Sequence, residues 1–376
     1  MIYSQLLHHF IFRSNVDPVN LKKRRNFTLS YRSLLLSLVL GSTALVANEY
    51  VYDDAYNSCC CEDQSRFLVR GEYLIFQTTW DQPHYVLSAT DNFFEGEHYP
   101  LANRHINNPP FKSGFRVEAA YLMPDCPTDL DLRFTWLQSS HTNTFAGPVL
   151  WVTKGFAGDG AQSGEDTPFD GVVQDSFNIH YYGGDLTFNR IHPGCCGENL
   201  TFLVGLHFAY VKFKENHLSG GTFPTDGGLA SVSNNLRNSS RFWGIGPQFG
   251  VDYKYDFFSH GDGGLTFVAN ARAALLASNT QAYVRAVTTR TGPLGLSIKN
   301  DTYWRVTPAF DARLGFSSTF DCFCLAGTVE FGYEMLYYSN VIDNILGYDV
   351  AYAGDTLDLY SNLNAQGPYV AVNLAF

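Results

Sequence analysis

The segment from Gly114 to His141 contains two alternating stretches with a turn between them. Apolar residues occupy every second position from Phe115 to Tyr121, and again from Leu130 to Trp136, with charged and polar residues between them. This period of two predicts a β-hairpin with one apolar and one polar face. Two environments fit such a hairpin. One is a soluble sandwich with an apolar core, and the other is an outer-membrane barrel with a lipid-facing side and a polar lumen.

The same alternation recurs along the chain and predicts ten strands. We expect them at Phe67–Thr78, twice within Gly114–His141, and at Phe177–Ile191, Phe202–Tyr210, Trp243–Phe257, Leu265–Leu275, Trp304–Phe316, Thr328–Met335 and in a last strand ending at Phe376. Gly183 and Gly184 predict a bulge or a bend in the fourth strand. Further strands around Tyr85–Ala89, Val149–Thr153 or Tyr283–Thr288 would raise the number to as many as fourteen.

Short turns alternate with long polar segments that are rich in glycine. We expect long loops at Trp80–Lys112, 142–176, Glu215–Ser240, Gln281–Asp301 and Ser339–Thr356. With an even number of strands, both chain ends fall on the short-turn side. The fold class that follows is all-β: an antiparallel transmembrane β-barrel of about ten strands, with short periplasmic turns and long extracellular loops. An alternating strand that ends on Phe376 also resembles the insertion signal of many outer-membrane proteins.

Residues 1–47 predict an extended N-terminal signal peptide. Basic residues at 22–25 and Arg32 precede an apolar stretch, Ser33–Ala47, that is too short for a spanning helix. Cleavage fits after Ala44 or Ala47, and an uncleaved anchor is the alternative. Residues 48–66 have no periodicity and are expected to form a cysteine-rich periplasmic arm, so the barrel is expected over 67–376.

The composition limits the classes of partner that the protein is expected to bind. Aromatic residues make up 15% of the chain, which suits a sheet with aromatic girdles at the membrane interfaces. The net charge of -11 removes the electrostatic reason for binding nucleic acid, so that class is excluded. Outer-membrane lipid is the expected partner. The composition does not decide between a monomer and a homo-oligomer.

All eight cysteines fall in the arm or in short turns. They are Cys59, Cys60, Cys61, Cys126, Cys195, Cys196, Cys322 and Cys324. In an oxidising compartment they predict disulfides, either staples between turns or cross-links to other envelope proteins. Metal binding, for instance by His192 with Cys195 and Cys196, is the weaker alternative because no CxxC pair occurs, and we expect neither metal nor cofactor.

The polar faces of the strands carry charges of both signs that are expected to line a pore. These residues are Arg70, Arg116, Glu118, Asp131, Arg133, Asp252, Lys254, Arg272, Arg305, Asp311, Arg313, Glu330 and Glu334. In a water-filled barrel, such nearly balanced charges predict weak ion selectivity. A barrel of about ten strands is only slightly wider than barrels filled by side chains, so Arg–carboxylate pairs could equally close it.

Three sets of short motifs resemble a known family. They are Arg70-Gly71-Glu72-Tyr73-Leu74, Ser113–Val117 followed by Leu130–Trp136, and Phe242–Pro247. From about Arg70 to Phe376 the chain resembles the Legionella-type major outer membrane proteins, a pore-forming barrel family with many members in chlamydia-like bacteria. The resemblance implies passive diffusion of small hydrophilic solutes, and chlamydial envelopes imply a disulfide-linked protein shell. The turn-side cysteines are more numerous here than the general pattern demands.

We therefore expect an outer-membrane porin for small hydrophilic solutes and ions, with turn-side cysteines that cross-link the envelope. A non-conducting structural or adhesin barrel of the outer membrane is the alternative. Catalysis is not expected, because the Asp and His residues predicted near the outer rim form no pair whose geometry can be argued.

Overall fold

The computed structural model describes residues 66–81, 84–89, 102–123, 127–152, 169–193, 198–225, 228–257, 264–288, 294–300, 302–322, 325–347 and 356–375. The chain divides into two compact units, 1–60 and 61–376, and the described residues all belong to the second. The predicted signal peptide and residues 48–65 of the predicted arm lie outside them. No helix within the described ranges is long and apolar enough to cross a membrane.

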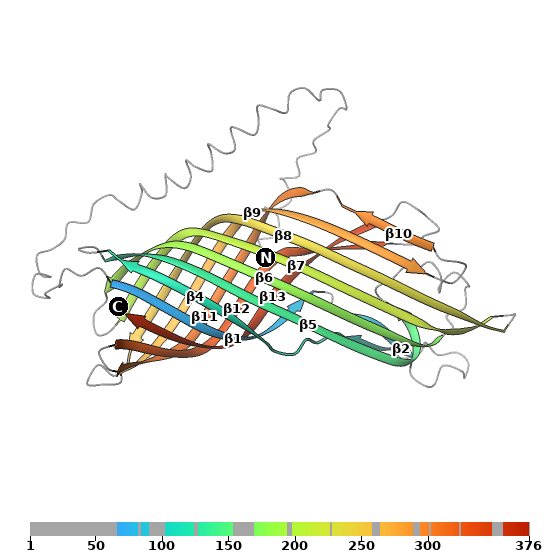
Figure 1. Cartoon of the computed structure of the whole chain (residues 1–376), viewed down its shortest axis with the longest axis horizontal. Coiled ribbons are helices and arrows are strands. Elements are labelled where there is room, and N and C mark those ends of the chain that lie inside the picture. Colours follow the sequence, from blue (N-terminus) through green and yellow to red (C-terminus); the bar gives the residue numbers. More distant parts are fainter. Residues whose placement is uncertain are drawn as a thin grey trace, which may run out of the picture. The chain divides into compact units, whose positions relative to one another are not determined.

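Ten strands close into an antiparallel ring (Figure 1). In chain order they are β1 (Arg66–Trp80), β4 (Lys112–Leu122), β5 (Thr128–Val152), β6 (Phe169–Pro193), β7 (Glu198–Thr225), β8 (Gly228–Asp256), β9 (Leu265–Thr288), β11 (Tyr303–Cys322), β12 (Leu325–Gly347) and β13 (Thr356–Ala375). The first and last strands, β1 and β13, pair with each other, and the β5–β6 pairing completes the ring. The predicted antiparallel barrel of about ten strands is confirmed.

Three short strands lie outside the ring. They are β2 (His84–Ala89) and β3 (Ala102–Ile106), which extend the sheet from β5, and β10 (Leu294–Lys299), which pairs with β9. The additional strand expected around Tyr85–Ala89 therefore exists as β2. The other two candidates, around 149–153 and 283–288, fall within β5 and β9 as parts of longer strands.

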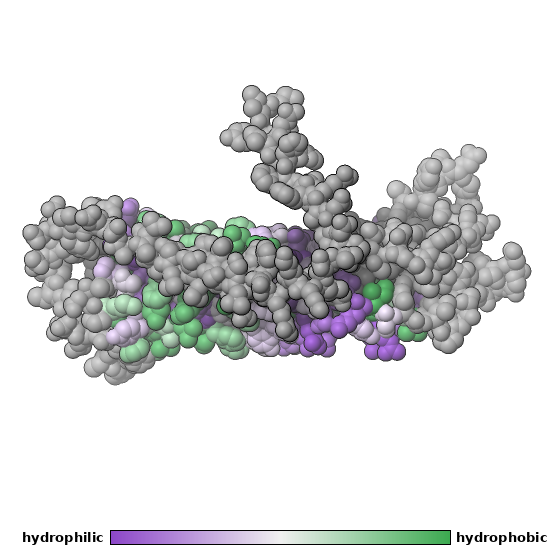
Figure 2. All heavy atoms as spheres, turned by 90° about the horizontal axis from the view of Figure 1, so that it is seen from above, coloured by the Kyte–Doolittle hydropathy of each residue, from purple (hydrophilic) through white to green (hydrophobic). Residues whose placement is uncertain are grey.

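Apolar side chains of the alternating pattern face outward over the end of the ring that carries the chain's C-terminus. Leu132 is 61% exposed and Phe249 is 56% exposed, whereas their neighbours on the opposite face point into the ring. Figure 2 shows this surface as a green belt that gives way to purple, hydrophilic side chains further along the ring. An apolar surface this extensive is the part of the barrel that lipid covers, so the hairpin at 114–141 presents its apolar face to lipid.

Aromatic side chains border this apolar belt on both sides. We call the border farther from the start of β1 and the end of β13 the outer aromatic row: Trp136, Tyr182, Tyr210, Trp243 and Trp304, the first four in register on β5–β8. At the other border, the rings of Phe67 and Tyr121 lie 5.0 Å apart. Along β7, the step from Phe202 to Tyr210 spans about 27 Å of strand. With the tilt of barrel strands it covers about 20 Å of membrane, close to a usual hydrocarbon thickness.

Strands continue well past the outer aromatic row. The prediction that Glu215–Ser240 is a loop is wrong, because β7 and β8 run through it and pair from Glu215–Asn238 to Thr225–Gly228. Outside the hydrocarbon, water can meet a strand face, so polar residues appear on the outward side and the apolar alternation is lost. Of the two features expected at Gly183–Gly184, a bulge or a bend, the bulge is wrong, since β6 pairs through both residues without a register shift.

Close approach of β8 to β9 requires glycine at one position. The pairing is interrupted between Ile245–Ala277 and Gln248–Ala274, where Pro247 supplies no N–H group to the ladder. A Cβ atom on Gly246 would collide with the carbonyl oxygen of Leu275, which belongs to the backbone and cannot rotate away.

We expect Gly246→Ala to lower the free energy of unfolding by about 1–3 kcal/mol, because the new methyl group displaces backbone. Urea unfolding of the refolded barrel, read from the gel migration of unheated samples, measures this change. Gly71→Ala is the control, since a Cβ there meets no atom within 4 Å. Equal unfolding midpoints for the two variants would contradict the close approach.

Candidate functional site in the barrel interior

All thirteen residues predicted to line the pore stand at inward-facing positions of the ring. Eight are buried: Arg116, Asp131, Arg133, Arg272, Asp311, Arg313, Glu330 and Glu334. Four are partly buried: Arg70, Glu118, Asp252 and Arg305. Lys254, near the end of β8, is exposed. Most of the predicted charges are thus taken up inside the barrel rather than left in a water-filled passage.

Glu72 of β1 holds together the charges at the centre of the barrel. Its side chain is 0% exposed and accepts hydrogen bonds from three arginines. Arg116 donates through Nη1 at 2.8 Å, and Arg313 donates through Nη1 and Nη2 at 3.0 Å each. Arg70 donates through Nε. In the ring, β13 and β12 stand between β1 and β11, so the Glu72–Arg313 pair spans part of the lumen.

Two glutamates of β12 extend this network. Arg116 bonds to Glu334 through both Nη1 and Nη2, at 2.8 and 2.5 Å, and Arg313 reaches Glu334 at 3.0 Å. Arg70 holds Glu330 with two bonds of 2.8 and 3.0 Å. The hydroxyl of Tyr369 donates to Glu330 at 2.6 Å, while its ring lies 4.5 Å from the Arg313 guanidinium carbon. These paired N–H donors favour a fixed geometry over a mobile, hydrated one.

A second chain of polar contacts starts at Arg133 of β5. Arg133 bonds to Asp185 at 2.6 Å and to Asp311 at 3.1 Å. Asp185 also contacts His207 Nδ1 at 2.6 Å, and His207 Nε2 contacts the Tyr338 hydroxyl at 2.8 Å. Tyr338 in turn lies 2.6 Å from the hydroxyl of Tyr181. The chain links the charged layer to the apolar side chains beyond it.

Strand register explains why these charges meet. Glu72 stands directly opposite Arg116 on β4, Arg313 opposite Glu334 on β12, and Arg133 opposite Asp185 on β6. Directly opposed residues on one face of an antiparallel pair are within reach of each other. The alternation in the sequence therefore puts the charges inside, and the register pairs them.

The central charges are joined in ion pairs. Four arginines pair with five carboxylates: Arg70, Arg116, Arg133 and Arg313 with Glu72, Asp185, Asp311, Glu330 and Glu334. Arg272 lies 3.9 Å from Asp252. Desolvating so many charges is costly, and mutual attraction offsets that cost only while every partner is present. The interior is thus stable as a complete set and sensitive to the loss of one member.

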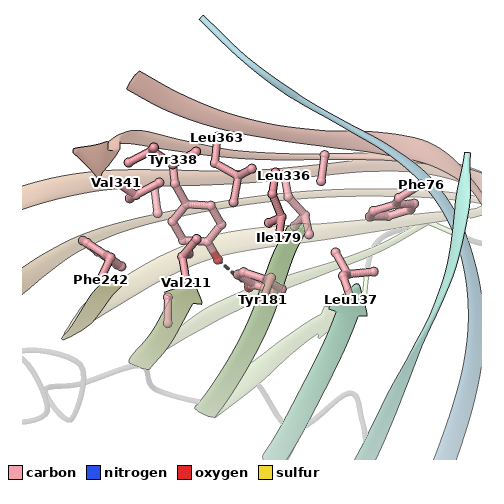
Figure 3. Close-up of a cluster of buried hydrophobic side chains, with 14 of the residues drawn as sticks. Phe76, Leu137, Ile179, Tyr181, Val211, Phe242, Leu336, Tyr338, Val341 and Leu363 are labelled. Atoms are coloured by element: carbon pink, nitrogen blue, oxygen red, sulfur yellow. Dashed lines mark hydrogen bonds between the residues drawn. The ribbon is translucent and has the colours of Figure 1, made fainter. Parts of the chain in front are cut away.

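An apolar layer fills the barrel on the outer side of these charges. Figure 3 shows side chains from opposite walls pointing toward one another, among them Phe76, Leu137, Ile179, Leu336 and Leu363. Two small cavities lie in this part of the interior, one beside Leu137 and Ile179, the other beside Arg133 and His207. Each leaves about 10 Å³ for the centre of a water molecule, which is room for roughly one water. The apolar side chains of this layer therefore pack against one another across the lumen.

Several residues of this interior were missed by the sequence reasoning. Glu72 follows Arg70 by two positions, so the alternation that places Arg70 on the inward face also places Glu72 there. Asp185 was missed because Gly183 and Gly184 suggested a bulge there. His207 alternates with apolar residues that face lipid, and strand periodicity alone would have placed it inside. Tyr338 lies beyond the end of the strand predicted at Thr328–Met335.

The cysteine predictions are untested by the structure. Cys322 is the last residue of β11, where its backbone pairs with Leu325. The other seven cysteines lie outside the described residues. Within the described ranges there is no group of three or more His, Cys, Asp or Glu side chains that could hold a metal ion.

Comparison with known proteins gives one family match. Residues 59–376 match the family described as the Legionella pneumophila major outer membrane protein precursor. No curated protein matches the sequence.

Among solved structures, the outer membrane protease OmpT from Escherichia coli is similar at a TM-score of 0.35 and 9% identity. The match covers 83% of this chain and 96% of that one. The P. putida toluene transporter TodX is similar at a TM-score of 0.25 and 6% identity, with 83% and 90% covered. Likenesses at this level do not bear on function.

We expect Glu72→Gln to destabilise the barrel by about 3–5 kcal/mol, because it leaves three buried guanidinium groups short of a negative charge. Urea unfolding followed by tryptophan fluorescence measures the loss. Glu198→Gln removes an exposed carboxylate at the start of β7 and serves as the control. If both variants unfold at the same urea concentration, Glu72 does not hold the network together.

Proposed function

Because the chain belongs to the family of the Legionella pneumophila major outer membrane protein, we propose that it serves as a sealed structural barrel of the bacterial outer membrane. In this role it spans the membrane without conducting ions, and its outer end forms a surface for structural or adhesive contacts. Its location in the outer membrane follows from the family match. The absence of conduction is the proposal.

One observation carries the proposal: the lumen holds a paired charge layer and, next to it, an apolar layer. An ion that entered from the end of the ring where β1 begins would have to displace guanidinium–carboxylate pairs that have several hydrogen bonds each. It would then meet side chains such as Leu137 and Ile179, which offer no polar group to replace its water. Moving a bare charge into such surroundings is strongly unfavourable.

The porin function expected from the sequence requires a continuous water path. The same charged residues would line such a path if they stood apart with water between them. Here they contact each other directly, and the cavities beside them have room for about one water each. This arrangement favours the non-conducting alternative over passive diffusion of hydrophilic solutes.

Long strands outside the lipid belt support the structural part of the proposal. Beyond Tyr210 and Trp243, β7 and β8 continue as a paired ribbon to Thr225 and Gly228. A ribbon of paired strands is stiffer than a loop, because the ladder satisfies its backbone hydrogen bonds. It can therefore hold a defined surface away from the membrane.

Envelope cross-linking by cysteines is the second part of the proposal. The connection from β6 to β7 contains Cys195 and Cys196, and the connection from β11 to β12 contains Cys324 next to Cys322. The strands β6 and β11 end, and β7 and β12 begin, at the end of the ring where β1 begins, since successive strands alternate in direction. Cysteines at one end of a barrel suit links to proteins on one side of the membrane.

Planar-bilayer recording tests the sealed lumen. We expect refolded wild-type barrel to give no conductance steps under conditions in which a general-diffusion porin gives them, because paired charges and packed apolar side chains would have to move before a hydrated ion could pass. Incorporation is verified independently by the amount of folded protein in the bilayer-forming vesicles. Regular steps from the wild-type chain would overturn the proposal in favour of a porin.

Gels of native envelopes test the cross-links. We expect the wild-type chain to migrate as a high-mass ladder without reductant and as a single band with it. Replacing Cys195 and Cys196 by serine should shorten the ladder, whereas Ser140→Cys, on the outer part of β5, should leave its pattern unchanged. A wild-type monomer band without reductant would contradict intermolecular disulfides.

A further inference from the structure

Basic side chains gather on the outward face of β6–β9, just beyond the outer aromatic row. We call this the basic face; it consists of His180, Lys212, Lys214, Arg237, Arg241 and Arg285. His180, Lys212 and Arg241 stand directly opposite one another across β6, β7 and β8. Since each is two residues beyond Tyr182, Tyr210 or Trp243 on its own strand, the three form a line parallel to the aromatic row. That line lies at the depth of the lipid headgroups.

A second and a third line continue the basic face away from the lipid belt. Lys214 is opposite Ser239 and Asn178, and further out Arg237 is directly opposite Arg285. The pairing of two arginines at adjacent positions is unfavourable on its own, because like charges that stand opposite each other repel. An anion that lay against both guanidinium groups would relieve this repulsion.

Negative charges are missing from this surface. At the outward positions of β6 from His180 to Val172, and at those of β7, β8 and β9 beyond the aromatic row, the described residues include no Asp or Glu, although the chain as a whole carries a net charge of -11. Asp170, near the start of β6, comes ten residues before His180. The nearby carboxylates Asp175 and Glu215 point into the barrel and are buried. Among the described residues, Lys212, Lys214, Arg237, Arg241 and Arg285 have no ion-pair partner.

The crowding of positive charge also affects His180. Burial and the charges of Lys212 and Lys214 lower its pKa, so the imidazole resists taking up a further proton. The opposite side of the ring differs at this level. There, the outward positions of β1 beyond Ile75 are Gln77 and Thr79, and Asp81 follows the end of the strand, so none of the three is a cation. The outward face of β1 therefore lacks the positive charge that β6–β9 carry at this level.

We propose that the basic face binds the phosphate groups of a phosphorylated glycolipid in the outer leaflet. Charge complementarity and depth select this occupant: the acyl chains would cover the lipid belt while the phosphates meet Lys212 and Arg241 at its edge. Arginine is suited to phosphate because its guanidinium can donate two parallel hydrogen bonds. Trp243 belongs to the outer aromatic row and is two residues from Arg241 on β8. Its ring would therefore lie against the start of the acyl chains. The proposal rests on the membrane location and not on the sealed lumen.

Binding of lipid A to the refolded barrel in detergent micelles tests the proposal, with native mass spectrometry as the readout. The probes are bisphosphorylated lipid A, its dephosphorylated form, inorganic phosphate and heparin. We expect the bisphosphorylated lipid to bind at least about tenfold more tightly than the dephosphorylated one. This comparison uses the wild-type chain alone, so it does not depend on the folding of any variant.

Variants locate the site. Replacing Lys212, Lys214 and Arg241 together by glutamine should weaken binding of the bisphosphorylated lipid by more than about tenfold. Arg190→Gln is the matched control, because Arg190 also faces outward on β6 but lies at the opposite border of the lipid belt. It should leave the affinity unchanged.

Three results would overturn the proposal. The first is equal affinity for the two forms of lipid A, and the second is equal binding by the triple variant and the wild-type chain. The third is competition by inorganic phosphate or heparin at concentrations near those of the lipid, which would indicate a soluble anion as the occupant.

Discussion

Neutralisation of Glu72 by three arginines is the interaction on which the interior of this barrel depends. The carboxylate joins Arg70 on its own strand, Arg116 on β4 and Arg313 on β11, so a single group connects three parts of the ring. Each arginine also bonds to Glu330 or Glu334, both on β12. Because charges buried without partners are so costly, the walls of the ring must keep the distances that let these groups meet. The charge network thereby fixes the width of the lumen as well as its contents.

Each part of the barrel surface has the polarity of its surroundings. Within the lipid belt, apolar residues face outward and paired charges face inward. Beyond the outer aromatic row this order is reversed: Leu137, Ile179 and Val211 point inward, while polar and basic residues face outward. The reversal allows one set of continuous strands to pass from lipid into water. It also explains why the lumen is closed by two different layers, one charged and one apolar, and why the basic face begins where the lipid belt ends.

Much of this architecture could be predicted from the sequence, because the lipid belt imposes a strict period of two. The alternation at Trp243–Phe257 is long enough to identify β8 and its outward face without further information. Where water meets both faces, that constraint disappears, and Glu215–Ser240 therefore suggested a loop although it is strand. The inward orientation of the candidate residues was also predictable, since it follows from the same period.

Contacts inside the lumen could not be predicted. Glu72 and Arg313 are 241 residues apart in sequence and meet only because the ring closes at a particular width. Whether charges with a given orientation bond to each other or leave water between them depends on that width. The Asp185–His207–Tyr338 contacts raise the same difficulty, because they join β6, β7 and β12 through a position that Gly183 and Gly184 had made ambiguous. The alternation of residues within one strand contains no information on which side chains make contact across the lumen.

The most direct test of the sealed lumen is the reaction of an introduced cysteine with a charged, membrane-impermeant thiol reagent. Ala365 faces the apolar layer and is 3% exposed, whereas Ser140 faces outward beyond the aromatic row. In a folded chain whose eight native cysteines are serines, Ser140→Cys should react and Ala365→Cys should not. Reaction of Ala365→Cys at the rate of Ser140→Cys would mean that water and ions reach the centre of the barrel, and would contradict a sealed interior.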